Sequence, residues 1–179
     1  FVSVFSIISI ISTLQYEAAI VLPKKDEIAI NLVALCFIIT IIVSLLTLLT
    51  VITFNAKITG WLGNNNLSIW LYFIPIPIFL TGVFNTLNNW ASRKKQFKRI
   101  AFRNISQSTA TGGSKVLFGF LKLTNIGLIV GTLIGQFTST YVLAWLTFKD
   151  DKKILKNIKK EKILAAAKEY RNFPKYVAW

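Results

Sequence analysis

Five long apolar stretches, separated by short polar connections, dominate the hydrophobic pattern of this sequence. They cover about residues 1–22, 32–54, 67–90, 100–122 and 126–148. A helix needs about 20 mostly apolar residues to cross the hydrocarbon core of a bilayer. The stretches do not alternate apolar and polar positions, as the strands of a membrane β-barrel would. The pattern therefore predicts an all-α membrane protein, with five transmembrane helices in a bundle over residues 1–148.

Two of these stretches carry further local signals. Residues 32–54 form the clearest span, because these 23 residues contain no charge. The third stretch holds Pro75 and Pro77 near its middle, and each proline removes a backbone donor, so a kink or break is expected there. The connection at residues 55–66 is rich in glycine and asparagine, which favour turns.

Connections rich in basic residues alternate with connections poor in them, as expected for five spans with alternate connections on the same side of the membrane. Two basic residues lie after the first stretch, six between Arg93 and Arg103, and ten between Lys149 and Lys175, whereas the other two connections hold only Lys57 and Lys122. Basic connections are retained in the cytoplasm. We therefore expect the chain to start outside and to finish in the cytoplasm. Residues 149–179 are predicted to form a basic amphipathic helix on the membrane surface.

Composition narrows the function classes. The chain has 179 residues, is 54% hydrophobic and has a net charge of +14. In a soluble protein that charge would suggest nucleic acid, but here it is confined to short connections, so no nucleic-acid partner is expected. The sequence has no His, and its one Asp-Asp pair, Asp150-Asp151, lies in a basic segment. We therefore expect no metal site, no catalytic residues and no enzyme, including a membrane glycosyltransferase.

The fourth stretch contains the most informative polar residues. Arg103, Gln107, Thr111 and Lys115 recur every four positions, which places them close to one face of a helix. A Lys inside a span costs about 2.5–3.5 kcal/mol on insertion scales. Either the Lys snorkels to the headgroups, or these four side chains line a wet cavity that holds an anion. We favour the cavity.

Polar residues in the other stretches extend this hypothesis. After the prolines, a helical stripe contains Thr81, Asn85, Asn88 and Ser92. Amide side chains suited to bind sugar hydroxyls are Asn85, Asn89, Gln107 and Gln136. Glu17 has two alternative interpretations, an interfacial carboxylate that faces water or a cavity carboxylate that pairs with a base or titrates.

Glycines in the fifth stretch predict close helix packing. Gly127, Gly131 and Gly135 form two overlapping GxxxG patterns. We expect this face to pack within the chain rather than to mediate dimerisation.

Several motifs together carry a resemblance to a known family. They are YEAAIVLP at residues 16–23, Pro75 with Gly82 and RKKQF at 93–97, Gly127-Leu128 with Gly131 and Gly135-Gln136, and YRNFP at 170–174. In this order they resemble motifs of the Wzx-type polysaccharide flippases, of the multidrug/oligosaccharidyl-lipid/polysaccharide exporter superfamily. One departure is Gln15, where the pattern often has Arg.

The resemblance implies a fragment of a larger transporter. The chain would hold spans two to six of a first six-helix lobe and the linker to a second lobe, with the first span and the second lobe outside this sequence. The chain begins in apolar sequence and lacks Met, and we therefore expect it to be part of a longer protein. Members of that family export a polyprenyl-pyrophosphate-linked oligosaccharide across the cytoplasmic membrane by alternating access, for surface polysaccharides such as O-antigen.

The resemblance also suggests roles and partners. Arg103 and Lys115 would bind the pyrophosphate, and the Pro75/Pro77 kink would be a hinge between the two open states. No cofactor is implied beyond a proton or sodium gradient, which related transporters use. Partners would be the lipid-linked oligosaccharide, membrane lipids, the second lobe and a polysaccharide polymerase.

Two other functions stay open at this stage. A multidrug or cation exporter of the same fold would need an acidic cavity, and Glu17 is the only acid within a predicted span. A non-transporting scaffold subunit of a polysaccharide-assembly complex would pair the Arg103–Lys115 stripe with protein. Labelling an engineered Cys at position 111 or 115 from the water side would discriminate between scaffold and transporter.

Overall fold

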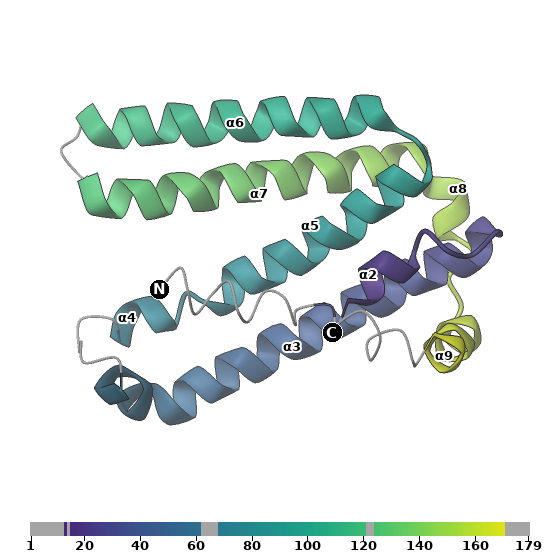
Figure 1. The fold of residues 1–179 in the computed structure, drawn as a ribbon, viewed down its shortest axis with the longest axis horizontal. Coiled ribbons are helices and arrows are strands. Elements are labelled where there is room, and N and C mark those ends of the chain that lie inside the picture. The colour runs from purple at the N-terminus through teal and green to yellow at the C-terminus, as the bar shows by residue number, and fades with distance from the viewer. Residues whose placement is uncertain (1–12, 14, 62–67, 121–123, 171–179) are drawn as a thin grey trace.

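Four long helices lie side by side in the computed structural model of this chain (Figure 1). The structure describes residues 13, 15–61, 68–120 and 124–170. The packing order across the layer is α3, α5, α7, α6. The long helices are α3 (Asp26–Trp61), α5 (Pro75–Arg93), α6 (Phe97–Phe120) and α7 (Thr124–Asp150). Within the described residues every regular element is helical, as predicted.

One end of the layer collects the charged connections. It contains the start of α3, the α5–α6 connection, the end of α7 and three short helices, as Figure 1 shows at the right. The short helices there are α2 (Tyr16–Ala19), α8 (Lys152–Leu155) and α9 (Lys160–Glu169), whereas α4 (Ser68–Leu71) lies at the other end. The described parts of the three base-rich connections and all seven acidic residues belong to this charged end, while Lys57 lies towards the opposite end.

Helix α3 is longer than the predicted span at residues 32–54. It has 36 residues and ends at Trp61, so the prediction of a loop from residue 55 onward is wrong for residues 55–61. An asparagine disfavours a helix mainly when its side chain competes for local backbone groups. The Asn55 side chain is occupied elsewhere: Nδ2 donates to the Ser68 carbonyl oxygen (3.1 Å) and Oδ1 accepts from Ser68 Oγ (2.9 Å). This contact holds α4 against α3.

The first predicted span falls mostly on residues 1–12 and 14, which lie outside the described residues. Its end is not the continuous helix predicted through Leu22, because Gln15 has a left-handed backbone with φ of 60° and α2 has only four residues. The chain then turns, and Arg93 Nη1 donates to the carbonyl oxygens of Ile20 (3.4 Å) and Pro23 (2.5 Å). The end of α5 therefore fixes the turn that leads into α3.

The prolines interrupt the third predicted span, as expected. Helix α4 ends at Leu71, three turn residues follow, and Pro75 opens α5. A proline in the first turn of a helix loses no intrahelical hydrogen bond. Pro75 and Pro77 both occupy this turn, and the Pro75 carbonyl accepts a hydrogen bond from Ser44 Oγ of α3 (3.0 Å).

The basic segment is not the single helix predicted over residues 149–179. Helix α7 includes Asp150, α8 and α9 are separate, and residues 171–179 lie outside the described part. Asn31 of α3 accounts for the interruption, because its side chain binds the backbone between the two short helices. Its Oδ1 accepts from the Lys159 N–H (3.0 Å), and its Nδ2 donates to the Asn157 carbonyl (3.4 Å).

Helix α3 alone, among the helices of the described residues, combines the length of a bilayer crossing with a sufficiently apolar sequence. Its outward face leaves a row of large apolar side chains exposed: Ile38, Ile41, Ile42, Leu45, Leu46 and Leu49. The inner face contributes to a core of buried residues near the charged end, which includes Ile30, Val33, Cys36 and Trp90.

Candidate functional site

A cleft of about 270 Å³ lies between α5, α6 and α7. Its walls are mainly amide and hydroxyl side chains, and no charged residue lines it within the described part of the chain. The lining residues are Thr81, Phe84 and Asn85 of α5, Gln107 and Thr111 of α6, and Thr132, Gln136 and Ser139 of α7. Four predicted site residues, Asn85, Gln107, Thr111 and Gln136, are therefore brought together.

Helical spacing aims these side chains at one another. Thr132, Gln136 and Ser139 are separated by four and three positions, so they share one face of α7. Gln136 Nε2 donates to Thr81 Oγ1 (2.5 Å), which bridges α7 and α5 across the cleft. Amide and hydroxyl groups of this kind can both donate and accept hydrogen bonds. The cleft therefore suits an uncharged ligand with many hydroxyl groups.

Arg103 lies beside this cleft rather than in its lining. Its guanidinium carbon is 4.6 Å from the centroid of the Phe84 ring, and Nη2 donates to Asn88 Oδ1 (3.2 Å). The residue is only 8% exposed, and its Nε is buried without a hydrogen-bond partner. Within the described residues no carboxylate pairs with it. A desolvated guanidinium with a free donor is a suitable site for an oxyanion.

Lys115 is not brought into the cleft with the rest of its stripe. Each step of four residues advances 400° around a helix, so three steps turn Lys115 by about 120° from Arg103. Arg103 consequently meets α5, whereas the Lys115 stem packs beside Gly131 of α7. The expectation that all four side chains share one face therefore fails at its far end. The rise between the two residues is about 18 Å.

The two remaining predicted residues also lie outside the cleft lining. Asn89 Nδ2 donates to the Asn85 carbonyl one turn earlier (3.0 Å). Glu17 of α2 is buried beside the α3 core, where its carboxylate accepts a hydrogen bond from the Thr13 hydroxyl. The water-facing interpretation of Glu17 is therefore wrong, and no basic side chain of the described residues pairs with it.

The glycine face of α7 packs against α6 within the chain, as predicted. A Cβ at Gly135 would fall 1.7 Å from Thr111 Oγ1, and one at Gly131 would fall 2.9 Å from Lys115 Cγ. Real Cβ contacts are much longer, so the two backbones can approach this closely only with glycine. We refer to this close contact between α6 and α7 as the α6–α7 seam. It determines how far Gln107 and Thr111 of α6 lie from the polar face of α7.

One buried and one half-exposed ion pair connect the helices of the cleft at the charged end. Arg99 of α6 binds Asp150 (Nη2–Oδ2, 2.7 Å) and Asp151 (Nη1–Oδ2, 3.0 Å). Trp90 Nε1 of α5 donates to the same Asp151 oxygen (2.9 Å). We refer to these four residues as the Asp151 cluster. The Asp151 cluster connects the end of α5, the start of α6 and the end of α7. The sequence predicts that these three helix ends lie on the cytoplasmic side.

Comparison with known families decides the identity of the chain. The profile described as "polysaccharide biosynthesis protein" matches residues 1–163, most of the sequence. The chain belongs to the polysaccharide biosynthesis protein family. This confirms the family suggested by the resemblance and assigns the chain a role in polysaccharide biosynthesis. Neither the curated proteins nor the solved structures gave a match.

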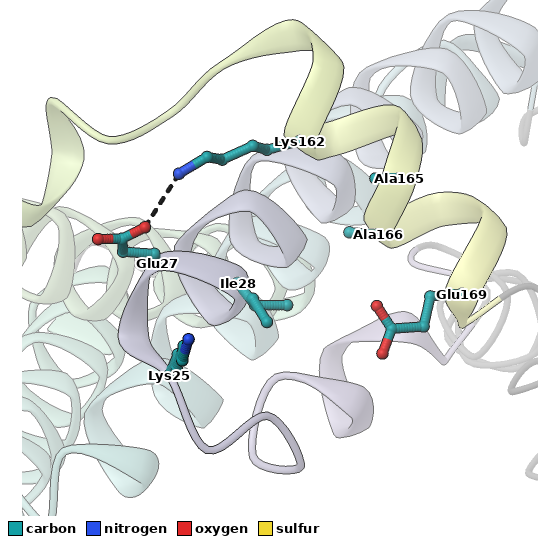
Figure 2. Close-up of a pocket in the computed structure, with 7 residues that line it drawn as sticks. All are labelled: Lys25, Glu27, Ile28, Lys162, Ala165, Ala166 and Glu169. Atoms are coloured by element: carbon teal, nitrogen blue, oxygen red, sulfur yellow. Dashed lines mark hydrogen bonds and ion pairs between the residues drawn. The ribbon is translucent and has the colours of Figure 1, made fainter.

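A second hollow of this polysaccharide biosynthesis protein, of about 300 Å³, lies between the start of α3 and α9 (Figure 2). Its lining mixes both charge signs with small apolar residues: Lys25, Glu27, Ile28, Lys162, Ala165, Ala166 and Glu169. Lys162 Nζ binds Glu27 Oε2 across it (2.9 Å), so part of its charge is already paired. For a member of this family, the neutral polar cleft is the better candidate for a carbohydrate.

The sequence alone does not reveal several residues in and around the cleft. Asn88 was noticed in the helical stripe of α5 but not assigned to the site, and it is Asn88 rather than Asn89 that contacts Arg103. Phe84 gave no polar signal, although its ring supports the guanidinium. Thr132 and Ser139 could have been found from their spacing to Gln136 on one helical face.

Proposed function

We propose that this polysaccharide biosynthesis protein is a five-span lobe of a transporter in the cytoplasmic membrane. It exports a polyprenyl-pyrophosphate-linked oligosaccharide by alternating access. The observation that carries the proposal is the uncharged polar cleft beside a desolvated arginine, between helices whose basic connections share one end. A sugar and a pyrophosphate need different solvation, and these two neighbouring environments match that need.

The chemistry of the cargo divides between the two environments. Sugar hydroxyls exchange hydrogen bonds with water for bonds to Asn85, Gln107 and Gln136 in the cleft. Arg103 offers the pyrophosphate its free Nε together with the remaining guanidinium donors, and such charge-assisted bonds are about twice as strong as neutral ones. Lys115 lies about 18 Å further along α6. A single pyrophosphate therefore contacts Arg103 first and reaches Lys115 only later, nearer the outer face.

The remaining features have secondary roles in this proposal. The Pro75/Pro77 turn is the hinge, because it already separates α4 from α5. Export is coupled to a proton or sodium gradient, as in related transporters. Glu17 is the acidic residue within a predicted span, and it is buried without a basic partner among the described residues. A second lobe provides the opposite wall of the cavity, and a polymerase receives the exported unit.

Replacement of Arg103 tests the proposal directly. In cells whose chromosomal copy carries Arg103→Ala, we expect export of the lipid-linked oligosaccharide to fall about tenfold or more, because a hydrogen-bonded charge contributes about 1.5–3 kcal/mol. The measurement is the amount of lipid-linked oligosaccharide accessible on each side of the membrane. Lys98→Ala, an exposed base of the same helix, is the matched control and should export normally. Unchanged export by Arg103→Ala, with normal insertion, would contradict the proposal.

Two alternatives make different predictions. A cation exporter of the same fold needs acidic groups, and no carboxylate lines the cleft within the described residues. For a scaffold subunit, the cleft should be sealed by partner proteins. Thr111→Cys, in a Cys36→Ala background, should react with a water-soluble maleimide in intact membranes if the cleft serves transport. Complete protection of this thiol would favour the scaffold.

A further inference from the structure

Helix α9 presents a regular outward ridge that nothing in the described chain covers. Lys160, Leu164 and Lys168 recur every four positions on the side of the helix opposite Ala166. Ala166 is buried against α3, whereas Leu164 is 72% exposed and both lysines are exposed. A large apolar residue between two lysines is the pattern of a helix that enters a lipid headgroup layer.

Contacts with α3 hold this ridge in place. Figure 2 shows Ala165 and Ala166 on the side of α9 that faces α3, and Lys162 reaching Glu27. The Asn31 side chain binds the backbone just before α9. Leu164 is therefore exposed because α9 is fixed with Ala166 inward, and not because the helix is detached.

The placement of α9 selects a lipid surface as the partner. In Figure 1 α9 is seen end-on at the base of α3, while the long helices run across the view. Its axis thus crosses theirs, as expected for a helix in the membrane plane. It also lies on the same side of the layer as α3, whose outward face exposes Ile38, Ile41 and Leu45. The lipid around α3 is accordingly continuous with the headgroups beside α9.

We infer that the Lys160–Leu164–Lys168 ridge binds anionic phospholipid headgroups of the cytoplasmic leaflet and fixes the depth of the bundle in the bilayer. The lysines contact headgroup phosphates and Leu164 inserts between them. Each Lys near an anionic surface should contribute about a fivefold preference. This inference rests on the membrane placement proposed above and adds a lipid specificity to it.

Site-specific quenching tests it in the full chain. Leu164→Cys in a Cys36→Ala background carries a fluorescent label, and the chain is reconstituted in vesicles of equimolar phosphatidylglycerol and phosphatidylcholine. Bromine atoms are placed on one lipid or on the other. We expect brominated phosphatidylglycerol to quench the label several-fold more than brominated phosphatidylcholine. This preference should disappear in Lys160→Gln/Lys168→Gln.

Two controls separate the possible failures. Lys152→Gln/Lys153→Gln removes the same charge from exposed positions of α8 and should keep the preference. A label at Leu46→Cys, on the apolar outward face of α3, reports insertion of the bundle. If the label at position 46 is quenched but the label at position 164 is not, or is quenched equally by both lipids, this inference alone is overturned. Absence of quenching at 46 would overturn the membrane placement as well.

Discussion

Removing the Asp151 carboxylate should destabilise the bundle far more than removing its neighbour. Asp151 is 5% exposed and accepts hydrogen bonds from the Trp90 indole N–H and from Arg99. In Asp151→Ala the buried indole loses its acceptor, which costs about 1–3 kcal/mol. Arg99 still binds Asp150 in this variant. Loss of the Arg99–Asp151 pair should therefore cost less than the 3–5 kcal/mol that is typical when a buried charge loses its only partner. We expect a total loss of about 3 kcal/mol.

The adjacent carboxylate supplies a matched control. The Asp150 side chain is 48% exposed and, among the described residues, pairs with Arg99 alone, so Asp150→Ala should cost at most about 1 kcal/mol. Asp151→Asn should fall between the two alanine variants, because its amide oxygen still accepts from Trp90 while the charge facing Arg99 is lost.

Thermal unfolding with a thiol-reactive dye measures these differences. Cys36 is the only cysteine in the sequence and is fully buried, so the dye reports exposure of the core. About 3 kcal/mol corresponds to a fall of roughly 6–12 °C in the midpoint for a chain of this length. The Asp150 variant should fall by about 4 °C or less. An Asp151→Ala midpoint no lower than that of Asp150→Ala would refute the reasoning.

Two further predictions concern the helix seam and the prolines. Gly135→Ala should lower the unfolding midpoint by an amount equivalent to about 1–3 kcal/mol, because its Cβ would overlap Thr111; Gly112→Ala, which meets open space, should leave the midpoint unchanged or raise it. If the two variants lowered the unfolding midpoint equally, close α6–α7 packing at Gly135 would not be the cause. Replacing Pro75 and Pro77 by Ala should change the midpoint by only a few degrees but reduce export, measured as for Arg103, and normal export would exclude the hinge.

The charged end shows why some contacts could not be predicted. Asp150 and Asp151 lie more than 50 positions after Trp90 and Arg99 in the sequence, and the residue types alone give no reason to join them. In the sequence, the Asp150-Asp151 pair argues only against a glycosyltransferase, because it lies in a basic segment. Its role became visible once α5, α6 and α7 ended at the same place, because a buried indole and a buried guanidinium both need an acceptor.

Sequence by itself determined the helical class, the family, the proline break and the close packing of the glycine face at residues 127–135. These depend on local quantities: the length of apolar runs, the missing proline donor and the absence of a glycine Cβ. Sequence spacing also selected four residues of the cleft. Tertiary structure alone decided that the Lys115 stem packs beside Gly131 of α7, that Asn88 contacts Arg103, and that Asn31 divides the basic segment into α8 and α9. Those outcomes depend on which neighbouring helix each face meets, and no local pattern along one chain encodes that choice.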